Sequence, residues 1–228
     1  MTPKFSFIIP VWNEESVILR TIEHIRGLQS AAGAEIIVVD GDSAGKTMEI
    51  ARRAGVKTII SERGRGNQMN DGAALAAGNI LIFLHADTSL PPDALAFIDT
   101  AMRDEFIMAG AFDLAIDSER PIFRLIEKAA TLRSRLTRIP YGDQTVFMRK
   151  TVFNKLGGFS NIPIMEDVEI MRRIKKQGGK IRIIDRTVRT SSRRWEREGI
   201  IYTTLRNWLL ITFYLLGVKP EKLVRFYR

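Results

Sequence analysis

The stretch NILIFLHAD, residues 79–87, is a continuous apolar run that ends in polar residues. A short run of Ile, Leu and Phe with a glycine before it is typical of a strand buried on both faces of a parallel sheet. In such sheets, ligands bind beyond the carboxyl ends of the strands. His85, Ala86 and Asp87, which close this run, are therefore the first candidates for a binding site.

Three similar apolar runs precede this stretch, namely FSFIIP (5–10), EIIVVD (35–40) and VKTIIS (56–61). Residues between them follow helical spacing, as Val17, Ile18, Ile22 and Ile25 do after the first run. Four β-α repeats in under 100 residues predict a parallel sheet covered by helices on both faces.

The second half is less regular, and its elements predict antiparallel additions to that sheet. Strands are expected at 109–116, 145–150 and 179–185, and helices at 91–104, 121–136, 150–156, 166–177 and 198–217. The fold class expected is α/β, with a mostly parallel, mixed sheet flanked by helices. We expect residues 1–197 to form one domain with two halves, one over 1–88 and one over 89–197. Residues 198–228 would be an apolar and basic helical appendage.

Composition narrows the classes of function. The net charge is +9, and Lys and Arg concentrate after residue 120. No basic motif interleaved with aromatic residues is present, so we expect no nucleic-acid partner. The charge fits a phosphate-bearing ligand or an anionic membrane surface, although a merely solvated basic face explains any single run equally well. With no cysteine, disulfides and thiolate metal sites are excluded. The start MTPKFSFIIP lacks a secretory pattern, so a cytoplasmic location is expected.

Polar residues follow each of the four strands. They are Asn13 and Glu14 after the first, Asp40, Asp42 and Ser43 at the second, Glu62, Arg63 and Arg65 after the third, and His85 and Asp87 at the fourth. Such residues also favour turns, but four successive loops would gather them along one sheet edge. Carboxylates and amides suit a base and ribose, and arginines suit a diphosphate. Mn²⁺ or Mg²⁺ takes oxygen ligands, often one or two carboxylates plus substrate phosphates, which makes Asp87 the expected metal ligand.

Four motifs together resemble family 2 glycosyltransferases of the GT-A fold, in a small bacterial single-domain subgroup. They are FSFIIPVWNEE, EIIVVDGDSAGKT, GRGNQMNDGAALAAGNILIFLHADT and GGFSNIPIMEDVEIMRRIKKQG, and they cover residues 5–186 in the expected order. The resemblance implies a nucleoside-diphosphate sugar donor, often a UDP-sugar, with Mn²⁺ or Mg²⁺, and an acceptor hydroxyl. It makes residues 1–197 the catalytic domain, with a nucleotide-sugar half over 1–88 and an acceptor half over 89–197.

The resemblance also implies roles for individual residues. Pro10, Asn13, Glu14 and Asp40 would line the nucleotide pocket, and Arg63 with the segment 64–72, Gln68 included, would close over the base and sugar. Asp87 matches the last aspartate of the family's D-x-D motif, which meets the metal. Glu166 and Asp167 match its E-D pair, in which one carboxylate is the general base. We expect Asp167 to act, at the N-terminus of a helix whose dipole favours the charged form.

The chain departs from the family pattern at two places. His85 stands at the first position of D-x-D, where an imidazole could bond ribose or phosphate or simply be packed. Arg194-Trp195 matches the end of a Q-x-x-R-W motif, but Ser191 replaces the glutamine, which argues against a processive synthase. Arg193 or Arg194 could contact the leaving diphosphate, and a solvated basic loop with a packed Trp195 is the rival reading.

The segment YGDQ (141–144) could present Asp143 and Gln144 to the donor sugar or the acceptor, and a plain turn explains it equally well. The expected function is thus inverting, non-processive sugar transfer from a nucleotide-sugar, with UDP favoured. One alternative is a nucleotidyltransferase, which would carry a glycine-rich loop where VWNEE stands. Another is a non-catalytic nucleotide-binding module, which would need neither Asp87 nor the Glu166–Asp167 pair.

The run WLLITFYLLGV (208–218) has only eleven residues, whereas about 20 are needed to span a bilayer. It would pack on the domain, form a homodimer contact, or lie in a membrane interface beside Lys219, Lys222 and Arg225. The first two readings are slightly favoured. The third would place the protein at the inner face of the cell membrane, where a lipid-linked acceptor could be used.

Overall fold

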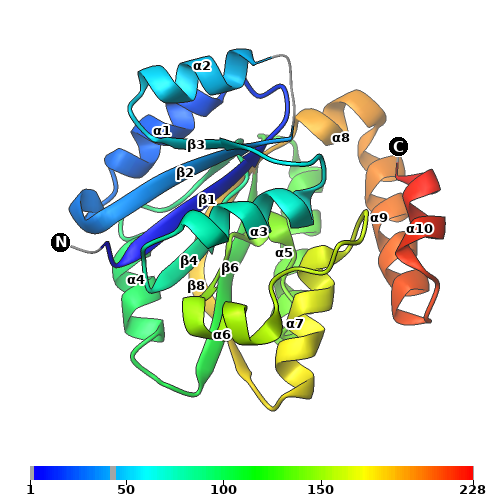
Figure 1. Ribbon diagram of the computed structural model, residues 1–228. Helices are drawn as coiled ribbons and strands as arrows, with labels where there is room; N and C mark the ends of the chain where they lie inside the picture. Colours follow the sequence, from blue (N-terminus) through cyan, green and yellow to red (C-terminus); the bar gives the residue numbers. More distant parts are fainter. Residues whose placement is uncertain (1–2, 42–44, 228) are drawn as a thin grey trace.

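Strand β4 (Ile80–Phe83), the run on which the prediction centred, lies in the middle of an eight-stranded sheet in the computed structural model (Figure 1). The structure describes residues 3–41 and 45–227. Asp42 and Ser43, expected at the site, lie outside these residues. The strand order is β3-β2-β1-β4-β7-β6-β8-β5.

The first four long strands pair in parallel, as predicted, and their carboxyl ends share one edge. They are β1 (Phe5–Val11), β2 (Ala34–Asp40), β3 (Lys57–Ile60) and β4. β1 is central, because it pairs with β2 on one side and β4 on the other. The loops after β1 and β4 are therefore neighbours in space.

Helices cover both faces of this sheet. In β1, Phe7 and Ile9 point into one apolar cluster and Ile8 into the other, the period-two alternation of a strand buried on both sides. The helices α1 (Ile18–Arg26), α2 (Lys46–Arg53) and α4 (Ala94–Ala101) cover the first face, and α3 (Arg65–Leu75), α6 (Lys150–Leu156) and α7 (Glu166–Lys176) cover the second. A short 3-10 turn, Ala31–Gly33, leads into β2.

Helix α3 lies unusually close to the sheet because residue 72 is glycine. A Cβ atom there would come 2.5 Å from Ile8 Cγ2 and 2.8 Å from Val39 Cγ2. These are closer than real carbon contacts, so no larger residue fits without a shift. This close approach brings Gln68, one turn earlier on α3, to the ends of β1 and β2.

The second half extends the sheet with β7 (Val146–Arg149), β6 (Ile107–Asp117), β8 (Lys180–Ser191) and the two-residue β5 (Thr88–Ser89). β7 runs antiparallel to β4 and β6, while β8 runs parallel to β6. The helix α5 (Pro121–Thr137) follows β6. The expected mixed sheet, parallel at its core, is confirmed.

Two boundaries were predicted wrongly. β8 does not end at Asp185 but continues to Ser191, because β6 is long enough to pair with it as far as Asp117. The segment after it is not a loop, since Arg193–Glu198 forms the short helix α8. The second half of this strand is rich in exposed polar residues, so the sequence did not show the apolar pattern of a strand there.

The C-terminal segment forms its own layer at one side of the molecule (Figure 1). It comprises α9 (Ile200–Leu215), α10 (Pro220–Leu223) and a final 3-10 turn, Val224–Phe226. A small apolar cluster of Ile164, Leu210 and Leu223 fastens it to the loop before α7. Within residues 3–41 and 45–227, no helix is both long and apolar enough to cross a bilayer.

Candidate active site

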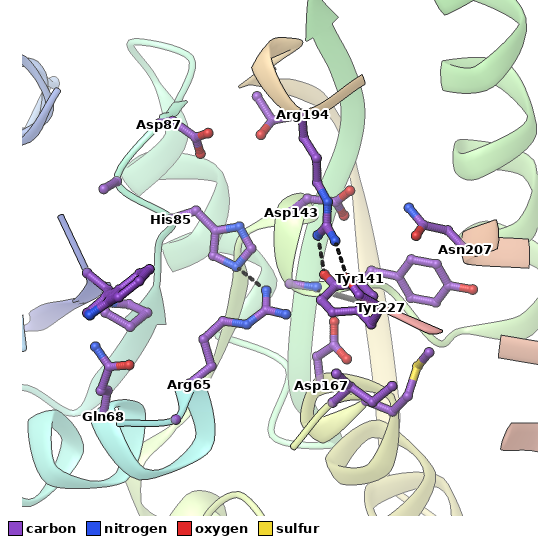
Figure 2. Close-up of a pocket in the computed structure, with 18 of the residues that line it drawn as sticks. Arg65, Gln68, His85, Asp87, Tyr141, Asp143, Asp167, Arg194, Asn207 and Tyr227 are labelled. Atoms are coloured by element: carbon purple, nitrogen blue, oxygen red, sulfur yellow. Dashed lines mark hydrogen bonds between the residues drawn. The ribbon is translucent and has the colours of Figure 1, made fainter. Parts of the chain in front are cut away.

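A cavity of about 610 Å³ opens at the shared carboxyl ends of β1 and β4 (Figure 2). Its wall comes from the loops after β1, β3 and β4, the loop before β7, the start of α7, the end of β8 and the C-terminal segment. Predicted residues that line it are Pro10, Glu14, Arg63, Gln68, His85, Ala86, Asp87, Asp143, Asp167, Arg194 and Trp195. Asn13, Asp40, Gln144 and Glu166 are not part of the wall.

Gln68 fixes the floor of the cavity. Its Nε2 donates to the carbonyl oxygens of Val11 at 2.8 Å and Val39 at 2.9 Å, which lie at the ends of β1 and β2. The side chain is almost fully buried. Gln68 therefore holds two strand ends in register, a structural role beside the ligand contact expected of it.

The loop after β1 forms one rim. Trp12 is exposed, and the guanidinium of Arg63 lies 3.9 Å from its ring centroid. Asn13 adopts the left-handed conformation with φ of 56°, which asparagine tolerates better than most residues. The backbone N–H of Glu14 donates to Thr47 Oγ1 at 3.0 Å, which ties the loop to α2. The rim thus offers a flat aromatic surface beside a cation.

Asp87 and Glu14 share one cation. Arg193 Nη2 lies 3.1 Å from Asp87 Oδ2 and 3.1 Å from Glu14 Oε2. Two carboxylates from neighbouring strand ends would repel each other without such a partner. Burial nevertheless raises the pKa of Glu14, with Arg193 opposing the shift. Arg193, not Arg194, is the arginine that contacts Asp87.

The residues around Asp87 fit a divalent cation only in company with an anionic ligand. Within the part of the chain that the structure describes, no group of three or more His, Asp or Glu side chains could hold a metal ion. One or two carboxylates are, however, what Mn²⁺ or Mg²⁺ often uses when substrate phosphates supply the remaining ligands. Asp87, with Glu14 held beside it, matches that donor set.

His85 lies deeper in the same wall. Arg65 Nη1 is 3.4 Å from its Nε2, and burial together with this guanidinium lowers the pKa of His85 to about 4. The imidazole is therefore neutral at physiological pH. It can bond a ligand, but it adds no positive charge for a phosphate.

Asp167 faces the cavity from the first turn of α7. Its Oδ2 accepts from the N–H of Gly142 at 2.5 Å and its Oδ1 from the N–H of Val168 at 2.7 Å. A Cβ atom on Gly142 would lie 3.0 Å from His85 Nε2 and 3.4 Å from Asp167 Oδ2. Glycine at 142 therefore lets the His85 and Asp167 side chains approach one small gap, and Figure 2 shows His85 and Arg65 between Asp87 and Asp167.

Glu166 points away from the cavity. It is only 2% exposed, and its Oε1 lies 3.1 Å from Arg65 Nε. Burial raises the pKa of Glu166, and Arg65 opposes that shift. Of the two adjacent carboxylates, only Asp167 lines the cavity, and Glu166 pairs with Arg65.

The loop YGDQ is an ordered 3-10 turn, Gly142–Gln144. Asp143 lines the cavity, and its Oδ1 has no hydrogen-bond partner among the described residues. Burial raises the pKa of Asp143 to about 6, with Asp167 adding to the shift and Arg133 opposing it. A buried, unpaired carboxyl oxygen at a cavity wall is free to bond a ligand hydroxyl.

The side chain of Gln144 bonds only to groups within the protein and not to the cavity. It is fully buried, and its Nε2 donates to the Phe112 carbonyl at 2.8 Å and to Ser134 Oγ at 3.0 Å. Its Oε1 accepts from the N–H of Tyr141 and from Arg133, both at 3.2 Å. Both the oxygen and the nitrogen of the amide have hydrogen-bond partners, so the buried Gln144 side chain stabilises the turn. Asp40, 1% exposed at the end of β2, is likewise buried away from the cavity.

Helix α8 and the C-terminus close the far side. Arg194 donates to the hydroxyl of Tyr227 and, through Nη2, to its carbonyl at 3.3 Å (Figure 2). Trp195 packs edge-on against Phe123 with ring centroids 6.0 Å apart, while its Nε1 finds no partner among the described residues. Asn207 Oδ1, from α9, is also without one. This end therefore combines aromatic surfaces with unmet donors and acceptors, as polyhydroxy ligands require.

Several lining residues were not predicted, namely Trp12, Tyr141, Asn207 and Tyr227. Trp12 and Tyr141 stand within motifs already singled out, so their position beside predicted residues was an available signal. Tyr227 lies 140 residues from Asp87 in the chain. Nothing in the local sequence pointed to it, because its place depends on how α9 and α10 turn back.

Comparison with known proteins agrees with this geometry. The sequence model of Glycosyl transferase family 2 matches residues 6–160. The PGL/p-HBAD biosynthesis glycosyltransferase of Mycobacterium bovis is 28% identical, over 90% of this chain and 97% of that protein. The probable glycosyltransferase YdaM of Bacillus subtilis is 26% identical, over 86% of this chain and 51% of that protein. These matches exclude the two alternative functions, a nucleotidyltransferase and a non-catalytic nucleotide-binding module.

Two solved structures share the fold. The mannosyltransferase PcManGT from Pyrobaculum calidifontis, in complex with GDP-Man and Mn²⁺, has a TM-score of 0.73 at 20% identity, covering 97% of this chain and 67% of that one. Glucosyl-3-phosphoglycerate synthase from Mycobacterium tuberculosis, with Mn²⁺, UDP and glucosyl-3-phosphoglycerate, has a TM-score of 0.61 at 18% identity, covering 81% and 70%. The expected GT-A fold is confirmed.

We predict that Asp143 makes stability depend on pH. Its folded-state pKa of about 6 lies above the value of about 3.9 for an unfolded chain. The folded protein therefore retains this proton over that range, and the free energy of unfolding falls as pH rises from about 4 to about 6. At pH 7.5, Asp143→Asn should be more stable than wild type by about 1 to 3 kcal/mol, with no gain at pH 3.5.

Urea unfolding at the two pH values measures this difference. Asp117→Asn, a change at the exposed end of β6, is the matched control and should show no such pH dependence. An Asp143→Asn gain that is equal at both pH values would contradict the account.

Proposed function

Since this chain belongs to glycosyl transferase family 2 and is a glycosyltransferase, we propose that it moves a sugar from a nucleoside-diphosphate sugar to an acceptor hydroxyl. One observation carries the proposal. The carboxylates of Asp87 and Asp167 enter a single cavity from different elements, and arginine side chains line the space near them. This arrangement suits a donor with its diphosphate near Asp87 and its sugar toward Asp167.

The diphosphate would meet several cationic groups. Arg63 lines the rim, Arg193 already bonds the carboxylates at the strand ends, and Arg194 lines the far wall. A buried diphosphate requires such partners, because its charges cannot be desolvated unpaired. UDP is the nucleotide we favour, on the family resemblance alone. The exposed Trp12 ring beside Arg63 would support the base.

Asp87, with Glu14 beside it, would hold a divalent cation, Mn²⁺ or Mg²⁺, which when bound supplies neutralising charge for the leaving diphosphate. The presence of Mn²⁺ in the two similar structures supports this part of the proposal. Glu14 would then either leave Arg193 and bind the metal ion together with Asp87, or keep its bond to Arg193.

Asp167 is proposed as the general base of a single displacement. Its carboxylate takes the proton of the acceptor hydroxyl while that oxygen bonds to the anomeric carbon and the bond from that carbon to the diphosphate oxygen breaks. The N–H groups of Gly142 and Val168 fix the direction of the carboxylate. Such a displacement inverts the anomeric centre. Ser191, in place of a glutamine, supports a non-processive transfer.

The acceptor is proposed to be a hydroxyl carried by a lipid-linked molecule. The far end of the cavity has an apolar wall made by Ile164, Met165, Leu210 and Ile211. Such a wall would accept the apolar part next to a hydroxyl head, while Trp195 Nε1 and Asn207 Oδ1, which line the same cavity without partners among the described residues, would bond the head itself. A chain without cysteine is in keeping with a cytoplasmic site of action.

The first test is a donor screen by calorimetry, using UDP-, GDP- and dTDP-sugars with and without Mn²⁺. We expect one class to bind in a Mn²⁺-dependent manner, and Asp87→Ala to weaken that binding at least about tenfold. Asp99→Ala removes a surface carboxylate that pairs with Lys4 and should change nothing. Binding that needs no metal and survives Asp87→Ala would overturn the metal assignment.

The second test separates the two adjacent carboxylates. With the donor identified, Asp167→Asn should lower kcat by about 10² to 10⁴ with little change in the donor KM. Glu166→Gln should keep most activity but lower the melting temperature, because Arg65 loses its buried partner. The reverse pattern, in which Glu166→Gln abolishes turnover of folded enzyme and Asp167→Asn keeps it, would show that the roles are exchanged.

A further inference from the structure

Helix α9 carries its apolar residues on the outside. Large apolar side chains recur along one face of the helix and its C-cap, and each is between 46% and 75% exposed. They are Ile201, Leu205, Trp208, Leu209, Phe213 and Leu216. Helices at the surface of a protein in water normally turn this stripe to the core. The pattern in α9 is the opposite.

The inner face of α9 explains why the polarity is inverted. Thr203 is fully buried, and Arg206 is buried with its Nη2 2.6 Å from Glu198 Oε2. Asn207 lines the active-site cavity, as Leu210 does. These polar groups face the cavity and helix α8, so the apolar stripe has no place against the domain. A contiguous exposed stripe of this kind marks contact with another apolar phase or partner.

The charges of the segment that follows the stripe identify the partner. Lys219, Lys222 and Arg225 are exposed there. Lys219 stands just beyond the end of α9, and the other two lie on the segment that turns back along it and ends with Tyr227 near Arg206 of α9. Between Gly199 and Tyr227 the chain has four basic residues and one acidic residue, Glu221. A second copy of the chain would offer these positive charges only one acidic residue from its own C-terminal segment, Glu221, so most of them would have no opposite charge there. A surface with negative charge over an apolar interior matches both the basic residues and the apolar stripe.

The length of α9 fixes its orientation on such a surface. Its 16 residues span roughly 24 Å, less than the roughly 30 Å of a bilayer core. The helix is also too polar on its inner side to be surrounded by lipid. It can lie in the plane of the interface, with its stripe at the acyl boundary and the basic side chains of the following segment at the head groups.

We propose that the outer face of α9, with Lys219, Lys222 and Arg225, is a docking surface for an anionic lipid bilayer. The inner face of the same helix lines the cavity, so the bilayer would lie one helix diameter, roughly 10 Å, from that wall of the cavity. The docking itself does not depend on which donor or acceptor the enzyme uses.

Vesicle co-sedimentation of the full chain tests the proposal, using phosphatidylcholine vesicles with and without phosphatidylglycerol. Wild-type protein should pellet with the anionic vesicles and release with added salt. Changing Lys219, Lys222 and Arg225 together to Gln should lower the partition coefficient on the order of 100-fold. Leu209→Gln with Phe213→Gln should lower it at least about tenfold.

The matched control is Leu19→Gln with Arg20→Gln on α1, an exposed apolar and basic pair elsewhere on the surface, which should bind as wild type does. Donor binding without vesicles should be equal in all variants, so failed docking and a failed proposed function are distinguishable. No pelleting with anionic vesicles would overturn the proposal. Equal loss in the α1 control would overturn it too, as would a dimer in sedimentation velocity that Leu209→Gln with Phe213→Gln dissociates.

Discussion

The pairing of Arg193 with Glu14 and Asp87 is the interaction on which the site depends. It joins the ends of β1 and β4, which belong to the parallel half of the sheet, to helix α8, which follows the last long strand. Parallel strands deliver their carboxyl ends to one edge, and here that edge collects acidic side chains. Like charges at such a distance are tolerated only with a cation between them. Without a ligand, the guanidinium of Arg193 fills that role.

This pairing has a consequence for the whole C-terminal region. Helix α8 is held to the strand ends by Arg193, and its next residue, Arg194, bonds Tyr227 at the end of the chain. The last segment, expected as an appendage, therefore supplies part of the cavity wall through Asn207, Leu210 and Tyr227. Helix α9 therefore has two faces. Its inner face lines the cavity, and its outer, apolar face is the proposed lipid contact.

Most of the fold could be predicted from the sequence, because buried parallel strands such as NILIFLHAD carry a strong, local apolar signal. The loops that follow them could be predicted to meet, since that is a property of parallel topology. The direction in which individual side chains point could not be predicted in this way. Glu166 and Asp167 are neighbours in sequence, yet one is buried against Arg65 and the other faces the cavity. Gln144 was expected at a ligand and instead holds a turn, because its partners Phe112 and Ser134 come from distant elements.

Substrate choice depends on parts of the site that the fold does not dictate. Two proteins with this fold were solved with different nucleotides, so the fold alone does not select the donor. The central claim is that a nucleotide diphosphate binds at the strand ends with a metal on Asp87. Anomalous diffraction from crystals grown with Mn²⁺ and UDP tests it most directly. We expect a manganese peak in direct contact with the Asp87 carboxylate and with the diphosphate. A bound diphosphate with no peak there, or a peak on other residues, would contradict it.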